Sequence, residues 1–224
     1  MTARTPHDYH HPSQPPPRYE TVGFNPGDTV LFLGDGTTAA EPGYVSLVAQ
    51  ALARTRSDLD LRLLNAGREG ATSRSALAHV AEDVLAHQPD WVVVGLGLND
   101  LNSVVAGQPE GVALPEFEDL YPRLVQTLRE AGIQVILMTT SVLGEDLKSK
   151  RNGFLKDYNR FIRDLAGREG LRVVDVNRAF QDAYDRAATY KQTISLTTDG
   201  VHPNLQGHAI IARTFMTELG LLGR

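Results

Sequence analysis

Residues 29–38 read TVLFLGDGTT, an apolar run of five residues followed by a glycine-rich acidic turn. The apolar residues of 29–33 follow one another without polar alternation, which is typical of a strand covered on both faces. The Gly-Asp-Gly turn predicts a sharp change of direction, because glycine adopts backbone angles that other residues avoid. The stretch therefore predicts a strand of a parallel sheet that passes through a tight turn into a helix.

Further apolar runs of the same kind recur along the chain, at 61–65, 91–96, 133–140 and 171–176. Apolar residues with helical spacing fill the segments between and after them, at 43–54, 73–87, 116–131, 153–169 and 204–219. Alternating strands and helices are typical of an open, doubly wound sheet. The sequence thus predicts an α/β fold with a mostly parallel sheet of about five strands, in a single domain spanning 22–224.

Composition excludes several classes of protein. The 224 residues carry a net charge of −5 with scattered basic residues, so we expect no nucleic-acid partner. The absence of cysteine excludes disulfides and thiolate chemistry. No apolar run approaches the roughly 20 residues of a membrane span.

The first 21 residues are polar and rich in proline and histidine. This composition is typical of a flexible arm, which we expect over 1–21. The segment lacks the apolar core of a secretory signal, so we expect a cytoplasmic location. His7, His10 and His11 could form a metal patch, but such a composition is more typical of a surface tail.

Ligands of doubly wound sheets bind beyond the carboxyl ends of the strands, where several polar residues of this chain fall. Gly70 stands in the loop NAGREGATS (65–73), where a backbone N–H could face a developing negative charge. Asn99 and Asp100 follow the third apolar run, and the asparagine could donate to an oxyanion or cap a helix. A plain turn remains the alternative for each of these loops.

Asp199 and His202 stand three residues apart, just before the last predicted helix. A loop of this length can bring a carboxylate to the imidazole Nδ1 and leave Nε2 free as a base. With the acidic turn and the two donor loops, this pair completes the components of acyl transfer.

At this point the sequence closely resembles the SGNH hydrolases, or GDSL-type esterases and lipases, over about residues 28–219. Gly34-Asp35-Gly36 matches the family's Gly-Asp-Ser block, and Gly70 matches its second-block glycine. Gly97-Leu98-Asn99-Asp100 matches Gly-x-Asn-Asp, and Asp199-Gly200-Val201-His202 matches Asp-x-x-His. The resemblance implies a flavodoxin-like three-layer α/β/α sandwich, with Asp35 and Asp100 as supporting residues of the site.

The resemblance also implies a role for each site residue. His202 would be the general base oriented by Asp199, and Gly36, Gly70 and Asn99 would form the oxyanion hole. It implies hydrolysis of carboxylic esters, thioesters or sugar acetyl groups without metal or organic cofactor. The mixture of small apolar and polar residues in 101–121 and 141–154 favours a modest acyl or acetyl group in a small-molecule ester. The sequence does not indicate the oligomeric state.

Gly36 stands at the position where the family carries its nucleophilic serine. Three explanations are open: an inactivated esterase, a natural pseudoenzyme that binds a ligand, and direct attack by water activated by His202. An acyltransferase is a further alternative, because the acyl-enzyme step is shared with hydrolysis. Thr37 and Thr38 are poor substitutes for the serine, because a displacement of about 1 Å can already cost about 100-fold in rate. We favour an esterase that is inactivated or specialised at Gly36.

Overall fold

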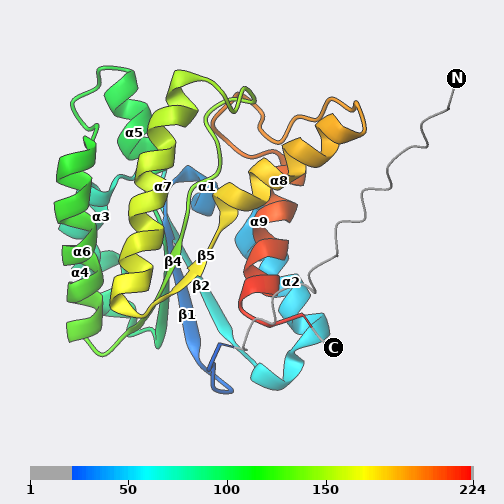
Figure 1. Ribbon diagram of the computed structural model, residues 1–224. Coiled ribbons are helices and arrows are strands. Elements are labelled where there is room, and N and C mark those ends of the chain that lie inside the picture. The colour runs from blue at the N-terminus through cyan, green and yellow to red at the C-terminus, as the bar shows by residue number, and fades with distance from the viewer. Residues whose placement is uncertain (1–21, 223–224) are drawn as a thin grey trace, which may run out of the picture.

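A computed structural model describes residues 22–222, so the predicted arm and its histidines lie outside the described residues. Its centre is one sheet with all strands parallel, in the order β2-β1-β3-β4-β5 (Figure 1). The strands are β1 (Thr29–Gly34), β2 (Arg62–Gly67), β3 (Trp91–Gly95), β4 (Gln134–Met138) and β5 (Arg172–Val174). The five predicted strands and their parallel arrangement are confirmed.

Helices cover both faces of the sheet and make a three-layer sandwich (Figure 1). One layer holds α2 (Tyr44–Thr55), α8 (Val176–Thr189) and α9 (Leu205–Glu218). The other holds α3 (Ser73–Ala78), α4 (Val80–Asp83), α5 (Leu98–Val105), α6 (Leu114–Glu130) and α7 (Lys150–Glu169). The short helix α1 (Gly36–Ala39) follows β1, and 3-10 turns occupy Ser57–Leu59 and Leu85–His87.

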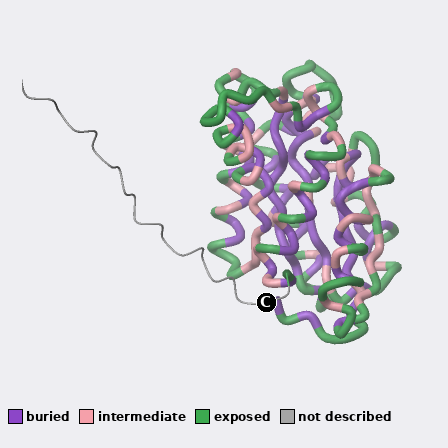
Figure 2. Tube along the Cα trace, turned by 90° about the vertical axis from the view of Figure 1, so that its right-hand side faces the viewer, coloured by how far each residue is buried: buried purple, intermediate pink, exposed green. Residues whose placement is uncertain are grey.

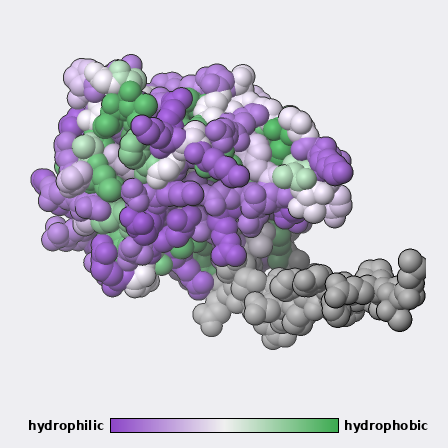
Figure 3. Space-filling model, turned by 45° about the horizontal axis from the view of Figure 1, so that its top comes forward, coloured by the Kyte–Doolittle hydropathy of each residue, from purple (hydrophilic) through white to green (hydrophobic). Residues whose placement is uncertain are grey.

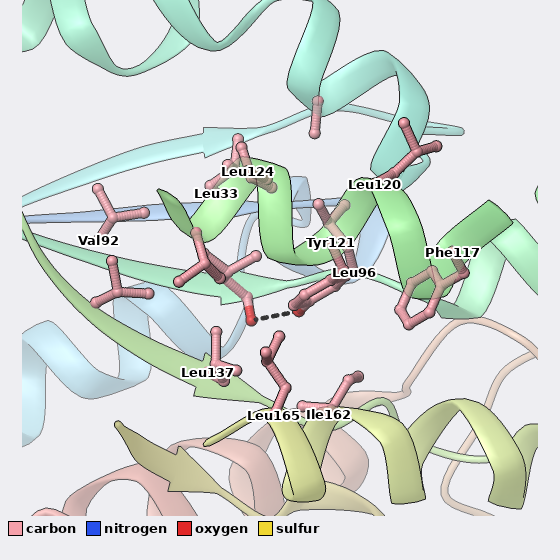
Figure 4. Packing of buried hydrophobic residues seen from close by; sticks show 14 of the residues in the cluster. Leu33, Val92, Leu96, Phe117, Leu120, Tyr121, Leu124, Leu137, Ile162 and Leu165 are labelled. Carbon is pink, nitrogen blue, oxygen red and sulfur yellow. Dashed lines mark hydrogen bonds between the residues drawn. The ribbon is translucent and has the colours of Figure 1, made fainter. Parts of the chain in front are cut away.

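The continuous apolar runs of the strands supply both cores, because successive side chains point to opposite faces. In β1, Val30 and Phe32 join the core beneath α2 and α9, whereas Leu31 and Leu33 join the core beneath α6. Figure 2 shows these buried strands at the centre of the molecule, between layers of mixed exposure. In the second core, Tyr121 of α6 donates a hydrogen bond to the Val94 carbonyl across 3.3 Å (Figure 4).

Three helical segments differ from the sequence expectation. The predicted helix 73–87 breaks at His79, whose φ of −108° and ψ of 9° depart from helical values, and again at Val84. Its N-cap is Thr72, one residue before the expected Ser73. No helix was predicted at 98–105 or 176–189, where the structure has α5 and α8. Within residues 22–222, no helix has both the length and the apolar character needed to cross a membrane.

Glycines at the carboxyl end of the sheet position α1. Gly34 pairs in register with Gly67 on one side and with Gly95 on the other. A Cβ on Gly34 would lie 2.9 Å from the Gly95 carbonyl oxygen, and one on Gly67 would lie 2.8 Å from the Ala39 Cα. Because these positions lack side chains, α1 packs directly on the strand ends.

Candidate active site

The predicted loops meet at one edge of the sheet, because all the strands run in the same direction. In Figure 1 this edge lies at the top of the sheet, around α1. Figure 3 turns it toward the viewer: hydrophilic residues cover most of the surface, with hydrophobic patches between them.

The turn after β1 is held by Asp35, the N-cap of α1. Its carboxylate accepts a hydrogen bond from the Thr37 N–H at 2.9 Å. Burial raises the pKa of Asp35 to about 6, although the bond from Thr37 opposes the rise. The side chain thus fixes the backbone at Gly36, the first residue of α1, from inside the protein.

The carboxylate of Glu69 lies in the volume that a side chain at position 36 would occupy. A Cβ on Gly36 would come within 2.7 Å of Glu69 Cδ and Oε1, and closer still to Oε2. These separations are shorter than real Cβ contacts, so any side chain at position 36 has to displace Glu69. The Glu69 side chain is 74% exposed and sits at the end of a flexible stem, so it is free to move.

The two threonines that follow Gly36 have surroundings of their own. Thr38 is buried, and its Oγ1 is hydrogen-bonded to the Tyr44 hydroxyl at 3.0 Å. Thr37 and Thr38 both line a small cavity of about 20 Å³, whose other walls include Met138 and Ile211.

Asp199 and His202 form the predicted pair. The Nδ1–H of His202 donates to Asp199 Oδ2 across 2.7 Å, and Oδ1 accepts the backbone N–H groups of Val201 and His202. These bonds lower the pKa of Asp199 to about 2. The hydrogen bond from Asp199 raises the pKa of His202, with smaller contributions from the charges of Glu69 and Asp35.

The loop that carries this pair is anchored at several points. Gly200 has a φ of +87° and its carbonyl accepts the Gly144 N–H at 2.6 Å. The Thr198 N–H bonds to the His202 carbonyl at 2.8 Å, closing the turn. The Nε2 of His202, the ring nitrogen away from Asp199, lies 3.9 Å from Glu69 Oε2. Because the Glu69 carboxylate lies against Gly36, this nitrogen faces the turn after β1.

Asn99 lies beside the loop that carries Gly70. The Asn99 side-chain amide donates to the Ala71 carbonyl at 3.3 Å, and its second hydrogen is left for another acceptor. Gly70 has a φ of +72° and no atom within 4 Å of a Cβ position, so its conformation rather than lack of space favours glycine. Glu69 precedes Gly70 directly, which brings this loop to Gly36 as well.

Asp100 ties the second loop to the third. Its Oδ1 accepts the Ser73 backbone N–H at 2.9 Å and the Ser73 hydroxyl at 2.5 Å, while Oδ2 has no partner among the described residues. Burial raises the pKa of Asp100 to about 6. The residue lies beneath the site and connects the start of α3 with the first turn of α5, which carries Asn99.

Contacts therefore link the predicted residues: Gly36 to Glu69, Glu69 to His202, His202 to Asp199, and Asn99 to the loop of Gly70. Glu69 was not predicted; its place beside Gly70 and after a strand was the only sequence signal. His208 lies apart in α9, where its Nδ1 accepts the Tyr44 N–H at 3.2 Å. No group of three His, Cys, Asp or Glu side chains within residues 22–222 is arranged to hold a metal.

The strand order β2-β1-β3-β4-β5 between two helical layers is that of a flavodoxin-like α/β/α sandwich, as the resemblance implied. The chain belongs to the GDSL-like lipase/acylhydrolase family, whose model matches residues 28–210.

Three relatives illustrate the membership. An acetylxylan esterase of Geobacillus stearothermophilus is 29% identical over 87% of this chain and 94% of its own. Its crystal structure gives a TM-score of 0.79 over 89% of this chain and 97% of that chain. Structures of catalytic mutants of that esterase carry alanine in place of a serine, of an aspartate and of a histidine three positions after the aspartate.

The second relative is LAE5, an alpha/beta hydrolase from the metagenome of Lake Arreo. It is 27% identical, with a TM-score of 0.80 over 90% of this chain and 99% of that chain. The third, an isoamyl acetate-hydrolyzing esterase of Saccharomyces cerevisiae, is 27% identical over 82% of this chain and 79% of its own.

Proposed function

We propose that the protein is a carboxylic ester hydrolase for small acyl or acetyl esters, with an acyl-transfer site that lacks the serine hydroxyl at Gly36. The observation that carries the proposal is the 2.7 Å bond between Asp199 and His202, with the opposite ring nitrogen directed at the turn of Gly36. The catalytic aspartate and histidine of the Geobacillus esterase have the same spacing of three, which supports it further.

In this proposal the oxyanion of the tetrahedral intermediate is bound by the backbone N–H groups of Gly36 and Gly70 and by the Asn99 amide. Donors fixed in advance by the fold stabilise such charge without reorganisation. The bond from Asn99 to the Ala71 carbonyl fixes the amide beside the loop of Gly70.

Small acyl groups are favoured by the pocket beside this loop and by the relatives. The pocket measures about 240 Å³. Gly70 and the small apolar residues Ala66, Ala71 and Ala76 line it, together with charged and polar residues that include Arg68, Glu69 and Asp83. Two of the relatives are named for acetyl esters.

Without the serine, activity is expected to be slow. A serine hydrolase without its triad retains about 10³–10⁴-fold catalysis over water, from the oxyanion hole and substrate binding. The native chain should therefore hydrolyse activated esters weakly.

The test is the rate of p-nitrophenyl acetate hydrolysis by the native chain, Gly36→Ser and Gly36→Ala. Both variants displace Glu69, but only serine adds a hydroxyl, so alanine is the matched control. We expect serine to raise kcat/KM by about 10²-fold or more over alanine. Equal rates for the two variants would show that position 36 is not a nucleophile position. Tight ester binding without turnover by Gly36→Ser would favour a binding protein.

A further inference from the structure

We propose that Glu69 is a catalytic residue of the native site: its carboxylate acts as the general base for direct attack of water on the ester, and His202 protonates the leaving alcohol. This inference rests on the proposed ester hydrolase function. It assigns a mechanism to the chain with glycine at position 36.

The first argument is the place of the carboxylate. Glu69 Cδ and Oε1 lie 2.7 Å from where a Cβ of residue 36 would be, so the carboxylate fills the side-chain volume of that position. A basic oxygen therefore stands beside the Gly36 backbone, in the region from which a serine side chain would approach an acyl carbon.

The second argument is the separation from the histidine. Glu69 Oε2 and His202 Nε2 are 3.9 Å apart, which is too long for a direct hydrogen bond. That separation accommodates one water bonded to both atoms. Such a water would lie between a carboxylate that accepts its proton and an imidazole that directs it.

The third argument is the charge around the imidazole. His202 faces Asp199 of its own loop, Glu69 from the loop after β2 and Asp35 from the end of β1, and all three raise the pKa of His202. This environment stabilises the imidazolium, which suits a proton donor. A serine mechanism instead requires the neutral imidazole as its base.

The reaction then proceeds in two steps. The water oxygen bonds to the acyl carbon while Glu69 takes one of its protons, and the oxyanion is bound by Gly36, Gly70 and Asn99. The bond from carbon to the alkoxy oxygen then breaks, and that oxygen takes the proton from His202 Nε2. Transfer of the proton from Glu69 to His202 restores the site, so one ester and one water give one acid and one alcohol.

Covalent attack by Glu69 itself is the alternative chemistry. It would form an anhydride by expelling an alkoxide, and the intermediate would collapse back to the ester because a carboxylate is the much better leaving group. Water is therefore the nucleophile that this arrangement favours.

The experiment compares Glu69→Gln in two backgrounds, the native chain and Gly36→Ser, with p-nitrophenyl acetate. In the native chain we expect kcat to fall about 10²-fold, in the range of general-base contributions. In the Gly36→Ser background we expect no fall, because the serine displaces Glu69 and supplies the nucleophile. Glu82→Gln, on the exposed surface of α4, is the control and should leave both rates unchanged.

The pH dependence gives an independent readout. With ethyl acetate, whose alkoxide leaves only when it is protonated, the native rate should fall as pH rises through the pKa of His202, because the proton donor is lost. The rate of Gly36→Ser should rise over the same range, because its base is gained. Profiles of the same sign in both chains would overturn the assignment of roles.

Two further results would overturn the proposal. One is a native rate that Glu69→Gln leaves unchanged or increases, which would show that the Glu69 side chain obstructs the site and does not catalyse the reaction. The other is incorporation of ¹⁸O from labelled water into Glu69 during turnover, which would mean covalent attack. Failure of Gly36→Ser to exceed Gly36→Ala refutes the ester hydrolase proposal instead, so the two failures are distinguishable.

Discussion

Replacing Asp100 with asparagine should stabilise the protein at neutral pH and not in acid. Asp100 is fully buried, and Ser73 donates two hydrogen bonds to its Oδ1, while Oδ2 has no partner among the described residues. Asp100→Asn keeps an oxygen for Ser73 and removes the buried charge. The main cost at neutral pH is the desolvation of that charge, which asparagine does not incur.

The magnitude follows from the pKa of Asp100. Burial raises it from 3.8 to about 6, which corresponds to about 3 kcal/mol at about 1.4 kcal/mol for each pH unit. Because the folded state binds the proton more tightly, the contribution of Asp100 to stability is greatest below pH 4 and is lost as pH rises through about 6. From pH 4 to pH 7.5, the free energy of unfolding of Asp100→Asn should therefore rise by about 2.5 kcal/mol relative to the native chain, because part of the effect is already present at pH 4.

Urea unfolding at these two pH values measures the difference. Asp164→Asn, at an exposed position of α7, is the control and should follow the native chain at both. The charge of Asp100 raises the pKa of Asp35, so part of the measured difference in stability will come from the titration of Asp35. If the difference between Asp100→Asn and the native chain is the same at both pH values, the buried-charge reasoning is refuted.

Three further substitutions test the site and its support. In the Gly36→Ser background, Asp199→Asn should lower kcat about 10³-fold or more and shift the rise of activity to lower pH. A pH profile with p-nitrophenyl acetate measures both effects, and an unchanged profile would contradict the orienting role of Asp199. In the same background, Asn99→Ala should lower kcat about 10²-fold with little change in KM, and a change in KM alone would remove it from the oxyanion hole. Asp175→Ala should lower the free energy of unfolding in urea by about 3 kcal/mol, because it removes the carboxylate that lies 2.8 Å from the guanidinium of Arg163. A loss below about 0.5 kcal/mol would contradict the stabilising role of this ion pair.

The sheet was predictable because its strands are buried on both faces and therefore lack polar alternation. The helix α8 was missed although Asp175 caps it and Phe180 and Ala187 lie on its buried face. The short strand β5 is followed almost directly by α8. The apolar run 171–176 therefore continues past the strand into the helix, and its sequence does not mark where the helix starts. The break at His79 depends on local backbone angles that the apolar spacing of 73–87 does not encode.

The candidate site was predictable where sequence spacing constrains geometry, as for Asp199 and His202 within one turn. Glu69 could not be found in this way. Its carboxylate approaches Gly36 and His202 only because the loops after β1 and β2 and the loop before α9 meet at one edge of the sheet. The same holds for Asp100 and Ser73, which are 27 residues apart in sequence.

The central claim is that residue 36 lies at the nucleophile position of an acyl-transfer site activated by His202. Labelling with a fluorophosphonate, which reacts with activated serine hydroxyls, tests it most directly. Mass spectrometry should find the Gly36→Ser variant phosphonylated at the introduced serine, and the native chain and Gly36→Ser/His202→Ala unlabelled. Absence of label at position 36, or equal labelling when His202 is replaced by alanine, would contradict the claim.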